Sequence, residues 1–115
     1  MGLYRQGDVL LVPITTDELP EKGTVGTRTV RRADDGRLIL AHGELTGHSH
    51  AFAAAEEDVS MRDRPETNDR FLEVVRDGGV LLEHPEHAAI RVPAGAYRVV
   101  RQREYTPERI VRVAD

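Results

Sequence analysis

The sequence predicts an all-β domain, either a small antiparallel β-barrel or a two-sheet sandwich. Short runs rich in β-branched and apolar residues alternate with Gly, Pro, Asp and Asn along the 115 residues, and a helical period is hard to find. Asp-Gly pairs, which favour tight turns, separate such runs at 35–36 and 77–78. A chain of this length forms one domain, and about eight or nine short strands in it favour a barrel or a sandwich.

The first half of the chain contains four expected strands. Residues 8–14, DVLLVPI, are almost continuously apolar and predict a strand that is buried on both faces and ends near Pro13. Residues 24–32 alternate between apolar and polar side chains, and the Asp35-Gly36 turn is expected to pair them with residues 37–42 in a hairpin. Residues 48–55 follow two glycines and predict another strand.

The second half begins with residues 56–69, which are highly charged; most of this segment is expected to form a mobile loop or a long hairpin tip within the single domain 1–115. A helix over residues 51–62 is the competing interpretation. After this segment, turn residues predict two more hairpins and a short last strand. The hairpins pair 70–76 with 80–84 and 88–92 with 96–105, and the last strand covers 110–113.

Composition excludes several classes of protein. The absence of cysteine excludes disulfides, thiolate metal ligands and a thiol nucleophile. A net charge of −4 is unlike the strongly basic surface of a general nucleic-acid binder. The apolar runs are too short for a membrane helix, and the first residues do not resemble a secretion signal, so we expect a cytoplasmic protein without a membrane partner.

The five histidines are confined to two windows, residues 42–50 (HGELTGHSH) and residues 83–87 (EHPEH). In an extended strand, His48 and His50 project from the same face, where two imidazoles can share one metal ion. His42 ends the preceding strand, and the short GELTG segment can fold it back toward His48. Glu44 adds a carboxylate within the same loop.

Pro85 predicts a bend or bulge in the second window, which allows His84 and His87 to converge. If the two windows meet, they form one polar site for a divalent transition metal. Imidazole and carboxylate ligands suit Zn, Fe, Mn, Ni or Cu. The predicted metal ligands are His48, His50, His84, His87 and His42; the candidate carboxylates are Glu44, Glu83 and Glu86, with Glu44 and Glu86 as candidate bases of a metal-dependent enzyme.

Other interpretations remain open. The histidines can be polar turn residues bonded to carbonyl groups, or they can serve as general acid and base without a metal. In the latter case Arg101 and Arg103 are candidate phosphate ligands, for an RNA or small-molecule substrate. A third class is a non-catalytic module that forms a homo-oligomer through exposed strand edges. The sequence contains no phosphate-binding P-loop, GxSxG or HExxH motif.

Several segments carry a resemblance to a known family. YRQGDVLLVP, GELTGHSHAF, EHPEHAAIRVPAGAYRVVRQREYTPE and the final VRVAD resemble a family of small bacterial and phage-borne proteins of uncharacterised function. The resemblance covers nearly the whole chain. It implies a stand-alone domain and carries no activity with it.

A second resemblance is to the cupins. The HSH motif on a strand, a later carboxylate and the VPAG turn are similar to the cupin pattern, in which two His, a Glu and a later His bind a metal inside a β-barrel. The resemblance implies that His48 and His50 are ligands and that Glu56 supplies the carboxylate. Because AYRVVRQ follows the Pro-Ala-Gly turn without a histidine, the fourth ligand would be His84 or His87.

Overall fold

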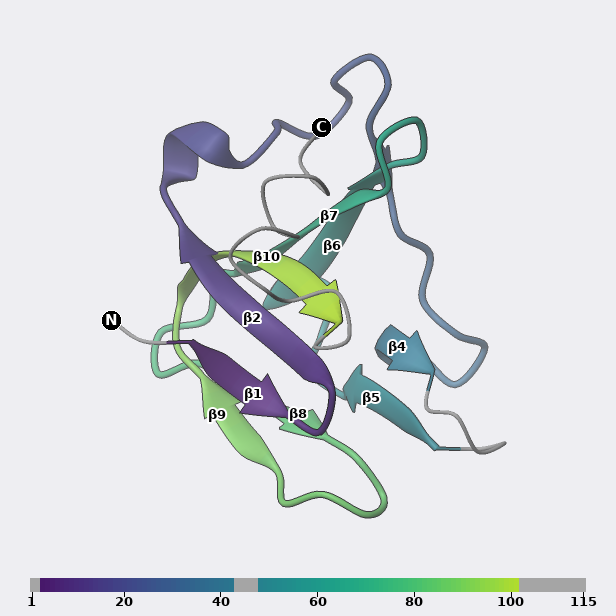
Figure 1. Ribbon diagram of the computed structural model, residues 1–115, viewed down its shortest axis with the longest axis vertical. Helices are drawn as coiled ribbons and strands as arrows, with labels where there is room; N and C mark the ends of the chain where they lie inside the picture. The colour runs from purple at the N-terminus through teal and green to yellow at the C-terminus, as the bar shows by residue number, and fades with distance from the viewer. Residues whose placement is uncertain (1–2, 43–47, 102–115) are drawn as a thin grey trace.

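The computed structural model, which describes residues 3–42 and 48–101, shows a sandwich of two antiparallel sheets (Figure 1). The predicted all-β class is confirmed, and within the described residues the strands form two separate sheets and no closed barrel. One sheet has six strands in the order β1-β2-β10-β7-β6-β3, and the other has four in the order β4-β5-β8-β9. The strands are β1 (Tyr4–Gln6), β2 (Val9–Ile14), β3 (Arg28–Thr29), β4 (Leu38–His42), β5 (Ser49–Phe52), β6 (Val59–Arg64), β7 (Asp69–Val74), β8 (Val80–Glu83), β9 (Ile90–Val92) and β10 (Gly95–Arg101), with a short 3-10 helix η1 at Thr16–Glu18.

The core lies between the two sheets and follows the two-residue period of the strands. On β8, Val80 and Leu82 are buried, whereas Leu81 and Glu83 between and beyond them are exposed. This alternation is the expected result of placing one face of a strand against the opposite sheet. The side chains that fill the core include Val9, Leu11, Leu38, Leu40, Phe52, Val59, Met61, Leu72, Val74, Val80, Leu82, Val92 and Tyr97.

The three predicted hairpins are wrong in their pairing, although the turns exist. The chain turns at residues 33–37, where the Gly36 amide donates to the Ala33 carbonyl oxygen at 2.9 Å. The strands on either side belong to different sheets, because β3 pairs with β6 and β4 pairs with β5. The same holds for β7 and β8, and for β9 and β10. An Asp-Gly or Pro-Ala-Gly turn reverses the chain, but it does not determine whether the next strand stays in the same sheet.

The segment expected to be a mobile loop or a long hairpin tip is half strand, and its residues 65–68 form the tip of a hairpin. Within residues 56–69, β6 forms an antiparallel pair with β7, and the turn between them includes Asn68 at φ 64°. The helix considered over residues 51–62 is absent as well, since this stretch contributes to β5 and β6. The charged composition did not reveal this strand, in which Val59 and Met61 lie in the core and Ser60 and Arg62 are buried as well.

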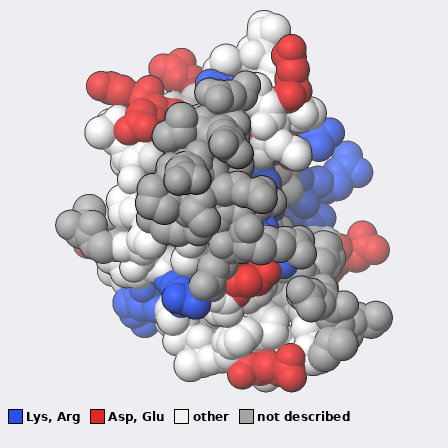
Figure 2. Space-filling model, in the orientation of Figure 1, with Lys and Arg blue, Asp and Glu red and all other residues white. Residues whose placement is uncertain are grey.

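The edges of the two sheets approach each other on both sides of the sandwich. β1 of the larger sheet lies beside β9 of the smaller one (Figure 1), and β4 contacts β6, which is next to the edge strand β3. None of the helices in the described part of the chain is long and apolar enough to span a membrane. On the face drawn in Figure 2, basic and acidic side chains form separate small groups, and neither sign of charge covers that face.

A histidine cluster at one end of the sandwich

The turn between β1 and β2 brings Gln6, Gly7 and Asp8 against the histidines of both windows. His50 lies on the inner face of β5 and is 2% exposed. Gln6 is equally buried at the end of β1. Because this turn lies more than forty residues from His50 in sequence, only the closing of the two sheets brings the segments together.

Gln6 determines the orientation of His50. Its Nε2 donates to the carbonyl oxygens of Leu82 at 2.8 Å and Ala88 at 3.0 Å, so its Oε1 is left as an acceptor. This oxygen lies 2.9 Å from Nδ1 of His50, which therefore carries the proton and donates. In the neutral ring, Nε2 of His50 is then the nitrogen with a free lone pair.

Gly7 allows the histidine rings to approach the turn. Its φ of +57° lies in the left-handed region, which favours glycine. A Cβ added here would lie 2.7 Å from Nε2 of His87 and 3.2 Å from Cε1 of His50. Any larger residue would therefore displace at least one of these two rings.

Asp8 places a carboxylate between His50 and Arg101. Its Oδ1 lies 3.6 Å from Nε2 of His50, and its Oδ2 accepts hydrogen bonds from Nε and Nη2 of Arg101 at 2.9 and 2.6 Å. Burial raises the pKa of Asp8, but the hydrogen bond and charge of Arg101 outweigh this effect and leave the pKa below its usual value. Asp8 is therefore a carboxylate at neutral pH.

The bend that contains Pro85 brings two further imidazoles to His50. The ring centroids of His50 and His84 are 4.4 Å apart, those of His84 and His87 are 4.6 Å apart, and those of His50 and His87 are 6.1 Å apart. The bend is also exposed to solvent, from residue 85 to residue 88. The predicted convergence of His84 and His87 is thus present in the structure.

His48 joins the outer edge of the cluster. Its ring centroid is 6.0 Å from that of His84, and its Nδ1 lies 2.7 Å from Oε1 of Glu86. Nδ1 of His84 accepts a hydrogen bond from the Glu86 backbone amide at 3.0 Å. Glu86 thus contacts two of the histidines, one through its side chain and one through its backbone.

The surroundings of the cluster favour uncharged imidazoles. Burial, followed by the charge of His84, lowers the pKa of His50 from 6.5 to about 4, against an opposing effect of Asp8. The pKa of His84 is also lowered, by burial and then by His87 and His48. At neutral pH both rings are therefore uncharged, which is the protonation state that metal binding requires.

The four described histidines of the cluster were expected from their two windows in the sequence, whereas the turn that completes the cluster was not. The side chain of His42, and all of Glu44 and Arg103, lie outside the described residues. Glu56, the carboxylate implied by the cupin resemblance, lines a separate hollow with Arg31 and Arg32. Gln6, Gly7 and Asp8 were missed, although a polar Gln-Gly-Asp sequence directly before the apolar run of β2 was a signal that this turn contributes more than a connection.

The donor atoms are close but do not form a complete coordination shell. Among the described residues, no group of three or more His, Asp or Glu side chains is placed to hold a metal ion. His84 illustrates the reason. Its Nδ1 accepts a hydrogen bond, so the neutral ring carries its proton on Nε2 and has no lone pair left for a metal. The ligand roles of the histidines therefore remain predictions.

The fold and the cluster define a small β-sandwich domain with a histidine-rich end. A family model described as a domain of unknown function, DUF8820, matches residues 5–102, and the chain belongs to this family. No curated protein and no solved structure matches the chain. The comparisons give the cupin resemblance no support. The matched family has no assigned function, as the first resemblance implied.

Proposed function

We propose that the histidine cluster binds a divalent transition metal ion, with His50, His87 and Asp8 as the first ligands and His84 as the fourth. The main support is the pair formed by Nε2 of His50 and Oδ1 of Asp8. Both atoms are acceptors, they face each other at 3.6 Å, and this distance is too long for a hydrogen bond. Two ligand atoms on one tetrahedral ion lie about 3.4 Å apart, so a cation fits between them.

The spacing of the rings gives independent support. Metal–nitrogen bonds of about 2.0–2.1 Å place the centroids of two imidazoles on one tetrahedral ion about 5 Å apart. The three separations among His50, His84 and His87 are 4.4, 4.6 and 6.1 Å, which bracket this value. Completing the shell requires rotations of the rings in the exposed bend, and His84 must also give up the hydrogen bond that its Nδ1 accepts from the Glu86 amide. Such side-chain changes commonly accompany binding.

Acid–base catalysis without a metal is the second candidate function. It is favoured by the contact between Oε1 of Glu86 and Nδ1 of His48, because a carboxylate at this position orients an imidazole and leaves Nε2 to exchange a proton. Phosphate binding by Arg101 receives less support, since its Nε and Nη2 already donate to Asp8. We therefore place the metal first.

The test is metal binding by untagged protein purified without chelator. We expect about one equivalent of metal by elemental analysis, and cobalt(II) absorption typical of a site with nitrogen and oxygen ligands. His87→Ala and Asp8→Asn should weaken binding strongly, whereas the control His48→Ala should retain it. The proposal fails if the parent protein binds no added Zn, Co, Ni, Cu, Mn or Fe, or if His87→Ala binds as tightly as the parent.

A further inference from the structure

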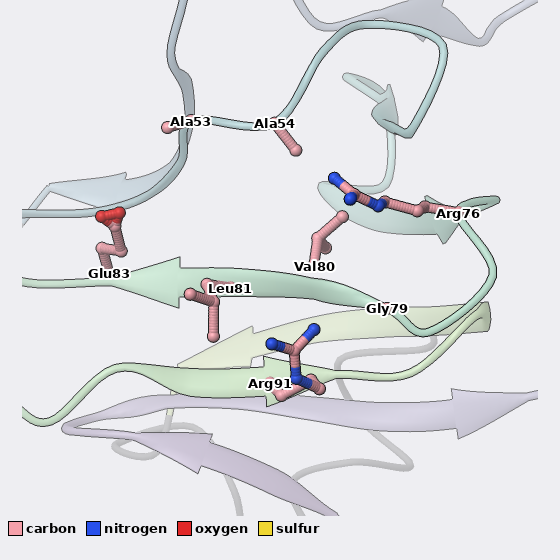
Figure 3. A pocket seen from close by; sticks show the side chains of 8 residues that line it. All are labelled: Ala53, Ala54, Arg76, Gly79, Val80, Leu81, Glu83 and Arg91. Atoms are coloured by element: carbon pink, nitrogen blue, oxygen red, sulfur yellow. The ribbon is translucent and has the colours of Figure 1, made fainter.

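A hollow of about 420 Å³ lies on the outer face of the four-stranded sheet. It shares no lining residue with the histidine cluster or with the hollow beside Glu56. Its floor is apolar, and Leu81 in this floor is 44% exposed. Figure 3 shows Ala53 and Ala54 along one side, across from β8 and β9. An exposed leucine next to a hollow of this size offers a surface for the apolar part of a small ligand.

Charged groups of opposite sign stand at the two ends of this hollow. Arg76 and Arg91 extend toward it from two different segments, and Glu83 lies at the other end, beyond Leu81 (Figure 3). Arg91 donates to the Gly78 carbonyl oxygen at 3.1 Å through Nη1. Neither Arg91 nor Glu83 forms an ion pair with any residue in the described part of the chain, so both charges are available to a ligand.

The strand register keeps these charges apart. Leu81 is directly opposite Arg91 in the β8–β9 pair, and Glu83 lies two residues further along β8. Two residues of a strand span about 7 Å. Because the Leu81 side chain stands between the two charges, a molecule that bridges them must cover this leucine.

The other basic group is also weakly engaged. Arg76 forms a long ion pair with Asp58, at 4.0 Å, and the Arg76 side chain is 60% exposed. Two guanidinium groups that line the same hollow from opposite sides of β8 offer a carboxylate several N–H donors (Figure 3). Glu83 would repel a polyanion such as nucleic acid and attract an ammonium group.

We propose that this hollow binds a short zwitterion, with its carboxylate on Arg76 and Arg91, its methylene chain over Leu81 and its ammonium group on Glu83. An α-amino acid is too short, because one carbon separates its two charged groups. An ω-amino acid of about five carbons has one charged group at each end of a methylene chain, so it can reach past Leu81 toward Glu83. This site is independent of the proposed metal site.

The experiment is an NMR titration of the full chain with 5-aminopentanoate, and with pentanoate and pentylamine as ligands that each lack one charge. We expect saturable shifts of the Leu81 methyl signals, with 5-aminopentanoate binding at least about threefold more tightly than pentanoate. Glu83→Gln should abolish this preference while pentanoate binding persists. Arg91→Gln should weaken the binding of both 5-aminopentanoate and pentanoate. Arg37→Gln, which removes an exposed arginine elsewhere, should leave the binding of both ligands unchanged.

Three results would overturn the proposal. They are the absence of saturable shifts with 5-aminopentanoate, equal affinity for 5-aminopentanoate and pentanoate in the parent protein, and unchanged binding in Arg91→Gln. Thermal unfolding of each variant distinguishes a lost ligand contact from a lost fold. The titration is carried out with excess chelator, so its outcome does not depend on the histidine cluster.

Discussion

Oε1 of Gln6 accepts a hydrogen bond from Nδ1 of His50 at 2.9 Å, and this contact directs Nε2 of the buried imidazole toward Asp8. The Gln6 amide cannot turn over without placing Nε2 against a donor and losing its bonds to Leu82 and Ala88. A single buried amide therefore joins β1 to β5, to β8 and to the bend that follows β8, and it also fixes the tautomer of His50.

The first prediction concerns this amide. Gln6→Leu should lower the free energy of unfolding by about 3 kcal/mol, because it leaves the His50 N–H and two carbonyl groups without their partner. Gln6→Glu keeps an acceptor for His50 but adds a negative charge, so the pKa of His50 should rise above its value of about 4. Urea unfolding and NMR titration of the His50 ring measure the two effects. An unchanged His50 pKa in Gln6→Glu would contradict the assigned contact.

The second prediction concerns Gly7. Gly7→Ala should destabilise the protein by more than the roughly 1–2 kcal/mol that a left-handed backbone costs an alanine, because the new Cβ would lie 2.7 Å from Nε2 of His87. Gly23→Ala is a matched control, since Gly23 has φ +82° and open space around its Cβ position. Equal losses of stability in the two variants would show that the rings near Gly7 move away at no cost.

The third prediction is a loss of stability in mild acid. The folded pKa of His50, about 4, lies below its unfolded value of 6.5, so folding disfavours the protonated ring. The contribution of the neutral His50 ring to the free energy of unfolding is complete above pH 6.5, and it is lost as the pH falls through 6.5 toward 4. The loss should reach up to about 3 kcal/mol, and the lowered pKa of His84 acts in the same direction. Urea unfolding between pH 4 and 8 measures it, and a stability that is flat over this range would be inconsistent with a depressed His50 pKa.

Most strands and the convergence of the histidines could be predicted from the sequence. The pairing of the strands, and the residues that surround the histidines, could not. A nearly continuous apolar run indicated β2, two glycines before residue 48 indicated the start of β5, and Pro85 correctly indicated the bend that brings His84 to His87. The turns after β3, β7 and β9 lead into the opposite sheet, and this outcome depends on how the two apolar faces pack together. The same packing brings the Gln6–Asp8 turn to the cluster, so no local pattern could reveal these residues as part of the site.

The last prediction tests whether Asp8 is a ligand of the proposed metal ion. Asp8→Asn preserves shape but removes the charge that faces His50 and pairs with Arg101. If Asp8 is a ligand, metal affinity should fall by about 10- to 100-fold or more, since even groups that only support a ligand have effects of this size. A bound metal raises the midpoint of thermal unfolding by mass action, so the shift produced by added zinc should shrink in Asp8→Asn. Glu73→Gln is the control, because it breaks the ion pair between Glu73 on β7 and Arg62 on β6, away from the histidine cluster. This variant should leave the zinc-induced shift intact. A zinc-induced shift that is equal in the parent and in Asp8→Asn would remove Asp8 from the ligand set and leave the imidazoles to bind the metal without a carboxylate.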